Sequence, residues 1–161
     1  MRELINRIFE LFDYIPERGE LVWRKPTTPR VKIGDVAGHL RADGYRRVSV
    51  DGKDYLIHRL IWLIEVGDWP QHELDHLNGR RDDNRFRNLR DVPRRTNIQN
   101  FRRARIDNAT GFLGVRKRRS RYHSVIVVHG RTVFLGSFDT PELAYEAYLK
   151  AKRQWHVGCT I

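Results

Sequence analysis

The net positive charge of this chain is confined to one stretch near its middle. Residues 80–121 hold fifteen Lys and Arg residues and four acidic residues, a difference that equals the net charge of +11 for the whole sequence. Fourteen of the fifteen are arginine, whose planar guanidinium group binds phosphate through paired hydrogen bonds. Charge concentrated in this way indicates a nucleic-acid partner. The alternative interpretation is a basic face that only contacts solvent.

A chain of 161 residues, 40% hydrophobic and 11% aromatic, is apolar enough to form one packed domain or two small ones. It has no apolar run of the length that spans a bilayer. Glu3, Arg7 and Glu10 interrupt the apolar residues near its start, unlike a secretory signal. Its one cysteine, Cys159, excludes an intramolecular disulfide and a cysteine-rich zinc site, and it has no evident base partner. We therefore expect a cytosolic protein that has no membrane partner.

Hydrophobic spacing predicts a mixture of helices and hairpins before residue 70. Apolar residues recur at helical spacing in residues 3–12 and again in residues 58–66. Between these helices, Asp43-Gly44 and Asp51-Gly52 separate three runs of β-forming residues, which predicts hairpins over residues 36–57. His58 stands at the start of the second helix, where we expect it to pack or to cap rather than to bind a ligand.

The last third of the sequence predicts a separate sheet-and-helix module. Residues 104–111 are polar without apolar periodicity and are interpreted as a linker. Three β-type runs follow, at 112–118, 122–129 and 132–138, and Thr140-Pro141-Glu142 has the composition of a helix start. One face of that helix is expected to carry Leu143, Ala144, Ala147, Tyr148, Ala151 and Trp155.

Residues 73–100 combine short extended segments with side chains suited to hydrolysis. A short strand is expected to end at Asp75-His76, and a second strand over residues 90–92 leads into a helix that carries Asn97. Carboxylate and amide oxygens are hard ligands, so Asp75 and Asn97 together suit one Mg²⁺ or Mn²⁺. The imidazole of His76 can deprotonate an attacking water near neutral pH.

The phrase DHLNGRRDDNRFRNLR, followed by Asn97, resembles the H-N-H homing endonucleases, which have a ββα-metal site. Together with the lead-in GYRRVSVDGKDYLIHRLIW, the resemblance covers roughly residues 14–103. It implies that His76 activates water, that Asp75 and Asn97 hold one divalent metal, and that Asn88 braces the loop between the strands. It also implies a phage-type or mobile-element enzyme acting in a bacterial or phage-infected cell.

Other interpretations of the same residues remain open. His72-Glu73-Leu74-Asp75-His76 fits the H-E-x-x-H zinc-protease pattern, although Asn78-Gly79 would break the helix that this pattern needs. Asp75-His76 could also be an ordinary surface pair, and Asn88 and Asn97 could be loop and cap residues. Asn100 lies on the same helical face as Asn97 and is expected to support it.

Residues 111–158 resemble the plant APETALA/ethylene-response-factor DNA-binding domain. The match rests on Gly114-Val115-Arg116, on residues 134–140 and on residues 144–148, whereas Leu113 and Val127 stand where that family usually has arginine. The resemblance implies a three-stranded antiparallel sheet whose exposed face enters the major groove. Arg116 and Arg118 match contact positions, and Phe134 stands at the position of a DNA-facing tryptophan.

The sequence thus predicts an α+β protein with two modules. Residues 1–103 form an H-N-H nuclease with its N-terminal helix and hairpins, 104–111 form the linker, and 112–161 form a three-stranded sheet plus one helix. We expect a metal-dependent endonuclease on double-stranded DNA, with no small-molecule cofactor, as a monomer or a DNA-assembled dimer. The alternative is a DNA-binding regulator with an inactive nuclease scaffold. Expected DNA contacts are Arg80, Arg90, Arg116, Arg118, Arg119, Arg121, Arg131 and Phe134.

Overall fold

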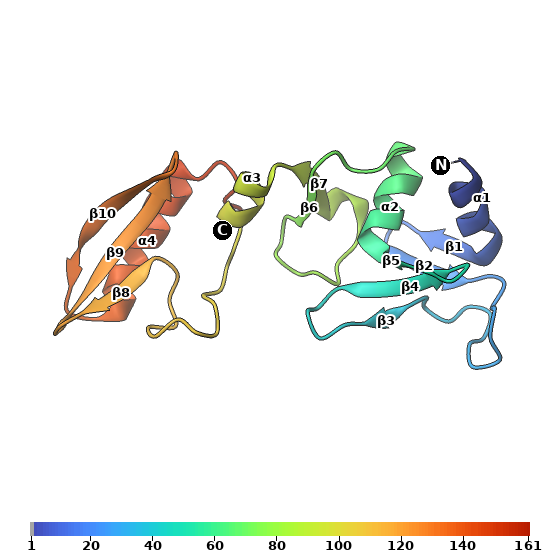
Figure 1. The fold of residues 1–161 in the computed structure, drawn as a ribbon, viewed down its shortest axis with the longest axis horizontal. Coiled ribbons are helices and arrows are strands. Elements are labelled where there is room, and N and C mark those ends of the chain that lie inside the picture. The colour runs from blue at the N-terminus through green and yellow to red at the C-terminus, as the bar shows by residue number, and fades with distance from the viewer. Residues whose placement is uncertain (1) are drawn as a thin grey trace. The chain divides into compact units, whose positions relative to one another are not determined.

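The computed structural model describes residues 2–161 and shows a mixed α and β protein built from small antiparallel sheets (Figure 1). It divides into two compact units, Met1–Pro93 and Arg94–Ile161. The predicted mixture of helices and antiparallel strands is confirmed, while the ββα-metal arrangement stays a prediction. In the part of the chain that is described, no helix has the length and apolar character needed to cross a membrane.

The first unit begins with the predicted amphipathic helix, α1 (Arg2–Leu11). Strands β1 (Phe12–Ile15) and β2 (Glu20–Trp23) follow and pair antiparallel, so that Phe12 lies opposite Trp23. Ile8 and Leu11 of the helix are buried, and so are Phe12 and Trp23 of the strands. The apolar face of α1 therefore packs into the core of this unit.

The predicted hairpins form a second small sheet with the strand order β3-β4-β5. Its strands are β3 (His39–Leu40), β4 (Arg46–Val50) and β5 (Lys53–Leu56). The first strand is shorter than the expected run over 36–40, because Val36 makes only an isolated bridge to Val22. Helix α2 (Ile57–Val66) packs against this sheet, and its residues Ile57, Leu60, Ile61 and Leu63 are fully buried.

A two-stranded sheet ends the first unit. Strand β6 (Glu73–His76) pairs antiparallel with β7 (Leu89–Val92), and the 3₁₀ turn η1 (Phe86–Asn88) immediately precedes β7. Leu89 belongs to the same buried core as α2. The rings of Trp62 and Phe86 lie 5.5 Å apart, so η1 packs on α2. The end of the loop between the two strands is therefore fixed by the core.

The second unit begins with the short helix α3 (Arg94–Gln99), which starts one residue after the proline expected to open it. A three-stranded antiparallel sheet of order β10-β9-β8 follows, with strands β8 (Val115–Arg118), β9 (Arg121–Val128) and β10 (Arg131–Phe138). Helix α4 (Pro141–Trp155) lies across one face of this sheet (Figure 1). The predicted topology of three strands and one helix is confirmed.

Helix α4 starts as predicted and buries Ala144, Tyr148 and Ala151 of the expected face, but not its two end residues. The hydroxyl of Thr140 accepts a hydrogen bond from the Leu143 backbone, and Pro141 is the first helical residue. Leu143 and Trp155 were expected on the buried face but are 47% and 39% exposed. Tyr145 and Leu149 pack on the core instead. The prediction was wrong for Leu143 and Trp155, because Tyr145 and Leu149 lie closer to the buried stripe of Ala144, Tyr148 and Ala151.

The division between the two units falls before the expected end of the nuclease module at residue 103. Residues 104–111, the expected linker, contain no helix or strand. They are nevertheless held in place, because Asn108 donates to the Phe112 carbonyl at 3.2 Å and accepts from the Thr110 backbone at 2.9 Å. The bounds of the two functional modules, 1–103 and 112–161, stay a prediction.

Candidate active site

Asp75 and His76 are the last two residues of strand β6. Asp75 lies opposite Arg90 on β7, and His76 lies opposite Leu89. The chain turns immediately afterwards, because the Gly79 amide donates to the His76 carbonyl at 2.8 Å. The Leu77 amide donates to the Asn88 carbonyl at 2.8 Å, which extends the pairing one step beyond the strands. Asp75 and His76 therefore lie where strand β6 ends and the loop over residues 77–88 begins.

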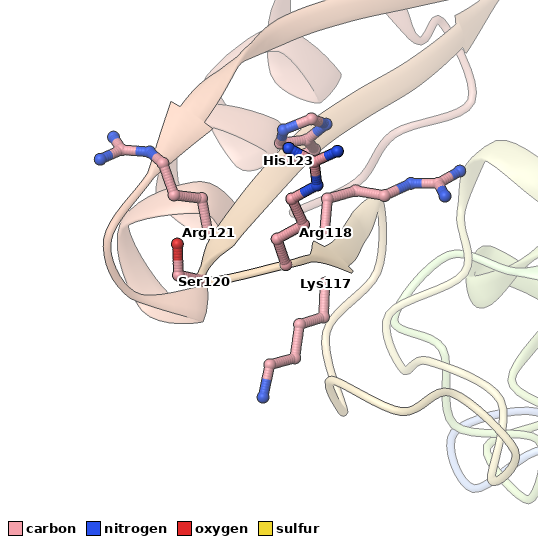
Figure 2. Close-up of a pocket in the computed structure, with 6 residues that line it drawn as sticks. Lys117, Arg118, Ser120, Arg121 and His123 are labelled. Atoms are coloured by element: carbon pink, nitrogen blue, oxygen red, sulfur yellow. The ribbon is translucent and has the colours of Figure 1, made fainter.

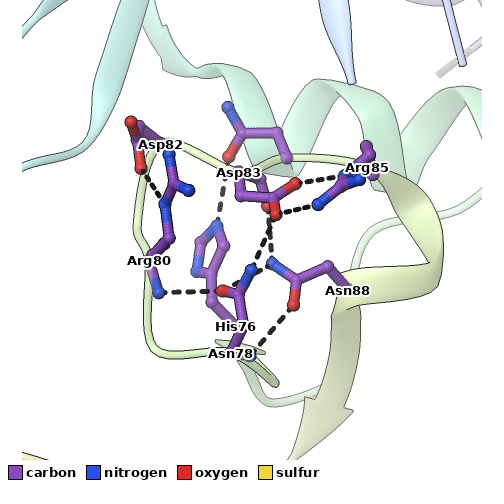
Figure 3. A network of polar contacts seen from close by, with 8 residues as sticks. His76, Asn78, Arg80, Asp82, Asp83, Arg85 and Asn88 are labelled. Carbon is purple, nitrogen blue, oxygen red and sulfur yellow. Dashed lines mark hydrogen bonds and ion pairs between the residues drawn. The ribbon is translucent and has the colours of Figure 1, made fainter. Parts of the chain in front are cut away.

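Asn88 ties the two sides of this loop together (Figure 3). Its side-chain oxygen accepts from the Asn78 backbone at 3.0 Å, and its side-chain nitrogen donates to the Asp83 carbonyl at 2.7 Å. Asn88 is buried, so these bonds are shielded from water. The amide therefore fixes the shape of the loop that leads away from His76.

Asp83 is the charged centre of the same network (Figure 3). Its carboxylate accepts from Arg85 through two nitrogens and from the Asn78 side chain at 2.7 Å. These bonds, those from Arg85 foremost, lower the pKa of Asp83 to about 2. The buried carboxylate is therefore ionised at neutral pH, and its partners supply the compensating hydrogen bonds.

His76 is held by a neighbour that sequence reasoning did not single out. The His76 Nε2 atom lies 3.1 Å from the side-chain oxygen of Asn84, which is 2% exposed. An amide oxygen can only accept, so in this contact the His76 ring donates from Nε2. Burial lowers the pKa of His76. The imidazole is therefore neutral at pH 7, which is the form that can take a proton.

The position of Asn84 depends on a glycine far away in the sequence. Gly19, in the turn between β1 and β2, has a φ of 65° and packs against the backbone of Asn84 and Arg85. A Cβ atom at Gly19 would lie 2.1 Å from the Arg85 nitrogen, so no other residue permits this approach. The first hairpin therefore supports the loop that orients His76. The sequence feature that could have indicated this contact is the polar run Asp82-Asp83-Asn84. Asp83 and Asn84 of this run are buried.

Two aromatic rings surround His76 on its other sides. The ring of His58 lies 5.2 Å from that of His76, and the ring of Tyr45 lies 5.9 Å from it. His58 is buried within α2, as expected for a packed residue, and makes no capping hydrogen bond. Burial lowers the pKa of His58 to about 3. A neutral histidine beside His76 adds no positive charge to the candidate site.

Asp75 accepts two hydrogen bonds from Arg90, at 2.9 and 2.7 Å, both on the same carboxylate oxygen. Arg90, an expected DNA contact, pairs in the structure with the expected metal ligand, and its contact with DNA stays a prediction. Asn97 is half-buried on α3, in the second unit. The pairing of Asp75 with Asn97 around one metal stays a prediction.

The predicted donors, the Asp75 carboxylate and the Asn97 amide, are of the type that a hard cation prefers. Among residues 2–161, no group of three or more His, Cys, Asp and Glu side chains could hold a metal. The predicted ligand pair needs only one carboxylate and one amide, completed by water and phosphate oxygens, as Mg²⁺ accepts. The zinc-protease interpretation is excluded, because Glu73–His76 form a strand and His72 and His76 cannot share one helical face.

The sheet of the second unit has one face covered by α4 and one open face. The open face carries Arg116, Arg118 and Phe134, all exposed, and the rings of Phe134 and His123 lie 5.2 Å apart. Figure 2 shows the hairpin between β8 and β9, where a shallow hollow is lined by cationic side chains that extend in different directions. Its lining residues are Lys117, Arg118, Arg119, Ser120, Arg121 and His123.

The remaining expected DNA contacts differ in how they are held. Arg121 donates to the Ser137 hydroxyl at 3.0 Å and to Asp139 at 2.6 Å, so its guanidinium is fixed across the sheet. Arg119 occupies the hairpin turn with a φ of 52°, and Arg131 is exposed at the start of β10. Arg80 is exposed in the active-site loop. Their contact with DNA stays a prediction.

Comparison with protein families finds one match, to the HNH endonuclease family over residues 55–99. The matched segment runs from β5 into α3 and includes Asp75, His76, Asn88 and Asn97. No curated protein and no solved structure matches the chain. Residues 55–99 are therefore similar to the HNH endonuclease family, which supports an HNH nuclease module, and the resemblance of residues 111–158 to the APETALA/ethylene-response-factor domain stays a prediction.

Proposed function

We propose that this protein is a metal-dependent, homing-type endonuclease that hydrolyses phosphodiester bonds in double-stranded DNA. The HNH family implies a DNA substrate and nuclease chemistry for residues 55–99. The observation that carries the proposal for this chain is the buried ring of His76, whose Nε2 atom lies 3.1 Å from the side-chain oxygen of Asn84. A positioned imidazole is the side chain best suited to remove a proton from water near neutral pH.

In this proposal His76 removes a proton from the water that attacks the scissile phosphate. The low pKa of its imidazole keeps the base form present at neutral pH. Asn88, Asn78 and Asp83 hold the loop rigid, so that the ring need not reorganise during the reaction. General-base catalysis by a positioned side chain contributes about 10²–10⁴-fold to the rate.

Asp75 and Asn97 would hold one Mg²⁺ or Mn²⁺. Such an ion supplies positive charge that stabilises the pentavalent phosphate and the leaving oxygen. Arg90 holds the Asp75 carboxylate in position through its two hydrogen bonds. In this proposal the same arginine also contacts a DNA phosphate.

The open face of the second unit would bind the duplex in its major groove. Arg116 and Arg118 project from the same side of β8 and are exposed, which suits contact with base edges and phosphates. Arg119 and Arg131, at the two hairpin ends, suit phosphate contact. In this proposal the second unit determines which DNA sequence is preferred, and the first unit hydrolyses the phosphodiester bond.

One observation favours the alternative function, a DNA-binding regulator with an inactive scaffold. Arg90 forms an ion pair with the carboxylate that would bind the metal, and a cation already in contact with Asp75 competes with a second one. In that case the protein would bind DNA tightly and cleave none.

Cleavage of supercoiled plasmid with Mg²⁺, Mn²⁺ or EDTA separates the two functions. If the protein is an enzyme, the wild type nicks plasmid with either metal and not with EDTA, and His76→Ala binds DNA but nicks it about 10²–10⁴-fold more slowly. His72→Ala is the matched control, because His72 is exposed and outside the loop network, and it should cleave normally. A wild type that binds DNA but leaves every plasmid intact would establish the regulator.

A further inference from the structure

Helix α3 cannot be stable by itself. It has six residues, Arg94–Gln99, and none of them is buried. Isolated helices shorter than about twelve residues are marginal in water, because the cost of nucleation exceeds the gain of a few hydrogen bonds. The helix must therefore be held by contacts around it, and the structure records these contacts within the second unit.

The first contact is a close backbone approach by Gly158, which follows α4. The Gly158 amide donates to the Gln99 side chain at 3.0 Å, and Gly158 is buried. A Cβ atom at this position would lie 2.2 Å from the Thr96 carbonyl oxygen. Only glycine allows the segment to lie so close to the helix backbone.

The second contact is a hydrogen-bonded cluster around Thr160. Its hydroxyl donates to the side-chain oxygen of Asn100, which is 4% exposed. Arg102 donates to the same hydroxyl oxygen at 2.8 Å and to the Thr160 carbonyl at 3.2 Å. The backbone N–H of Asn100 in turn donates to the Asn97 backbone carbonyl at 3.0 Å, so the cluster fixes the last turn of the helix.

The third contact joins the helix end to α4. Lys152 is 1% exposed, and its ammonium group donates to the Phe101 carbonyl. Burial lowers the pKa of Lys152, and the carbonyl supplies one of the hydrogen bonds that a buried ammonium requires. Three separate residues of the sheet-and-helix module therefore bind the segment 96–102.

We propose that Gly158, Thr160 and Lys152 form a seat that orders α3 and thereby positions Asn97. They would be positioning residues for the nuclease, located about sixty residues beyond the family match in the sequence. The catalytic consequence rests on the proposed metal-binding role of Asn97, whereas the ordering of α3 does not. Residues 1–103 alone would then lack the residues that order α3.

Hydrogen exchange of the full chain tests the ordering directly. Gly158→Ala and Thr160→Val should each speed amide exchange in residues 97–101 by at least about tenfold, while exchange in β9 stays unchanged. Thr160→Ser keeps the hydroxyl and should restore protection. Val157→Ala is the matched control, because Val157 is 85% exposed and adjacent to Gly158. Unchanged exchange in both Gly158→Ala and Thr160→Val would overturn the proposal, whatever the activity.

Metal dependence of plasmid nicking tests the positioning. Thr160→Val should need at least about tenfold more Mg²⁺ for half-maximal nicking, with unchanged DNA affinity, and Thr160→Ser should behave as the wild type. Faster exchange with an unchanged metal requirement would overturn the positioning role. If the wild type does not cleave at all, the proposed function fails, and the exchange result still decides whether the seat orders α3.

Discussion

Because of His58, the first unit should lose stability when the pH falls into the mildly acidic range. Its ring is 5% exposed beside His76, and its pKa falls from an ordinary 6.5 to about 3 because burial disfavours the charged form. The unfolded chain therefore binds a proton at a pH where the folded protein does not. Stability from this group is present above pH 6.5 and is lost as the pH falls from 6.5 towards 3.

The magnitude follows from the two pKa values. At pH 5 an unfolded-state histidine is almost fully protonated and the folded-state ring is almost fully neutral, which destabilises the unit by about 2 kcal/mol relative to pH 7. In His58→Met this contribution disappears. The loss of stability between pH 7 and pH 5 should then be about 2 kcal/mol smaller than in the wild type. His76 still titrates in both proteins, so most of its effect cancels in the difference.

Urea denaturation at the two pH values measures this difference. Trp23, Trp62 and Trp69 belong to the first unit, and Trp155 belongs to the second. A Trp155→Phe background therefore restricts the fluorescence signal to the first unit, with or without His58→Met. Equal losses of stability in the two proteins would refute the argument, because they would mean that the folded protein accommodates a charged His58.

Three further substitutions test separate parts of the candidate site and DNA-binding surface. Asn84→Ala should slow plasmid nicking by about one to two orders of magnitude without changing DNA affinity, because His76 loses its hydrogen bond inside the protein. Asn88→Ala should lower the free energy of unfolding of the first unit by about 2–3 kcal/mol in urea denaturation, since buried partners lose their bonds. Arg116→Ala should weaken binding to a duplex selected from a random pool more than to random DNA in a gel-shift assay, and equal losses would make Arg116 a phosphate contact.

Much of the fold could be predicted because local signals agreed with the final structure. Asp51-Gly52 produced the expected hairpin, and Thr140-Pro141 produced the expected start of α4. Strand β6 ends at His76 as predicted. These features depend on residues close together in the sequence, whose backbone preferences decide the outcome.

The parts that could not be predicted depend on contacts between distant residues. Gly19 packs against Asn84, and Gly158 packs against α3. In each case two backbone segments meet that no sequence pattern relates to each other. The side chain of Arg90 turns to Asp75 because the strand register places them opposite each other, which composition cannot reveal. The prediction for the buried face of α4 was wrong at Leu143 and Trp155, because Tyr145 and Leu149 pack on the core in their place.

Single-turnover cleavage with excess protein shows whether His76 acts as the base in hydrolysis of DNA. With saturating Mg²⁺ and every duplex bound, we expect His76→Ala to cleave about 10²–10⁴-fold more slowly than the wild type. If His76→Ala cleaves bound DNA at the wild-type rate, His76 is not the base.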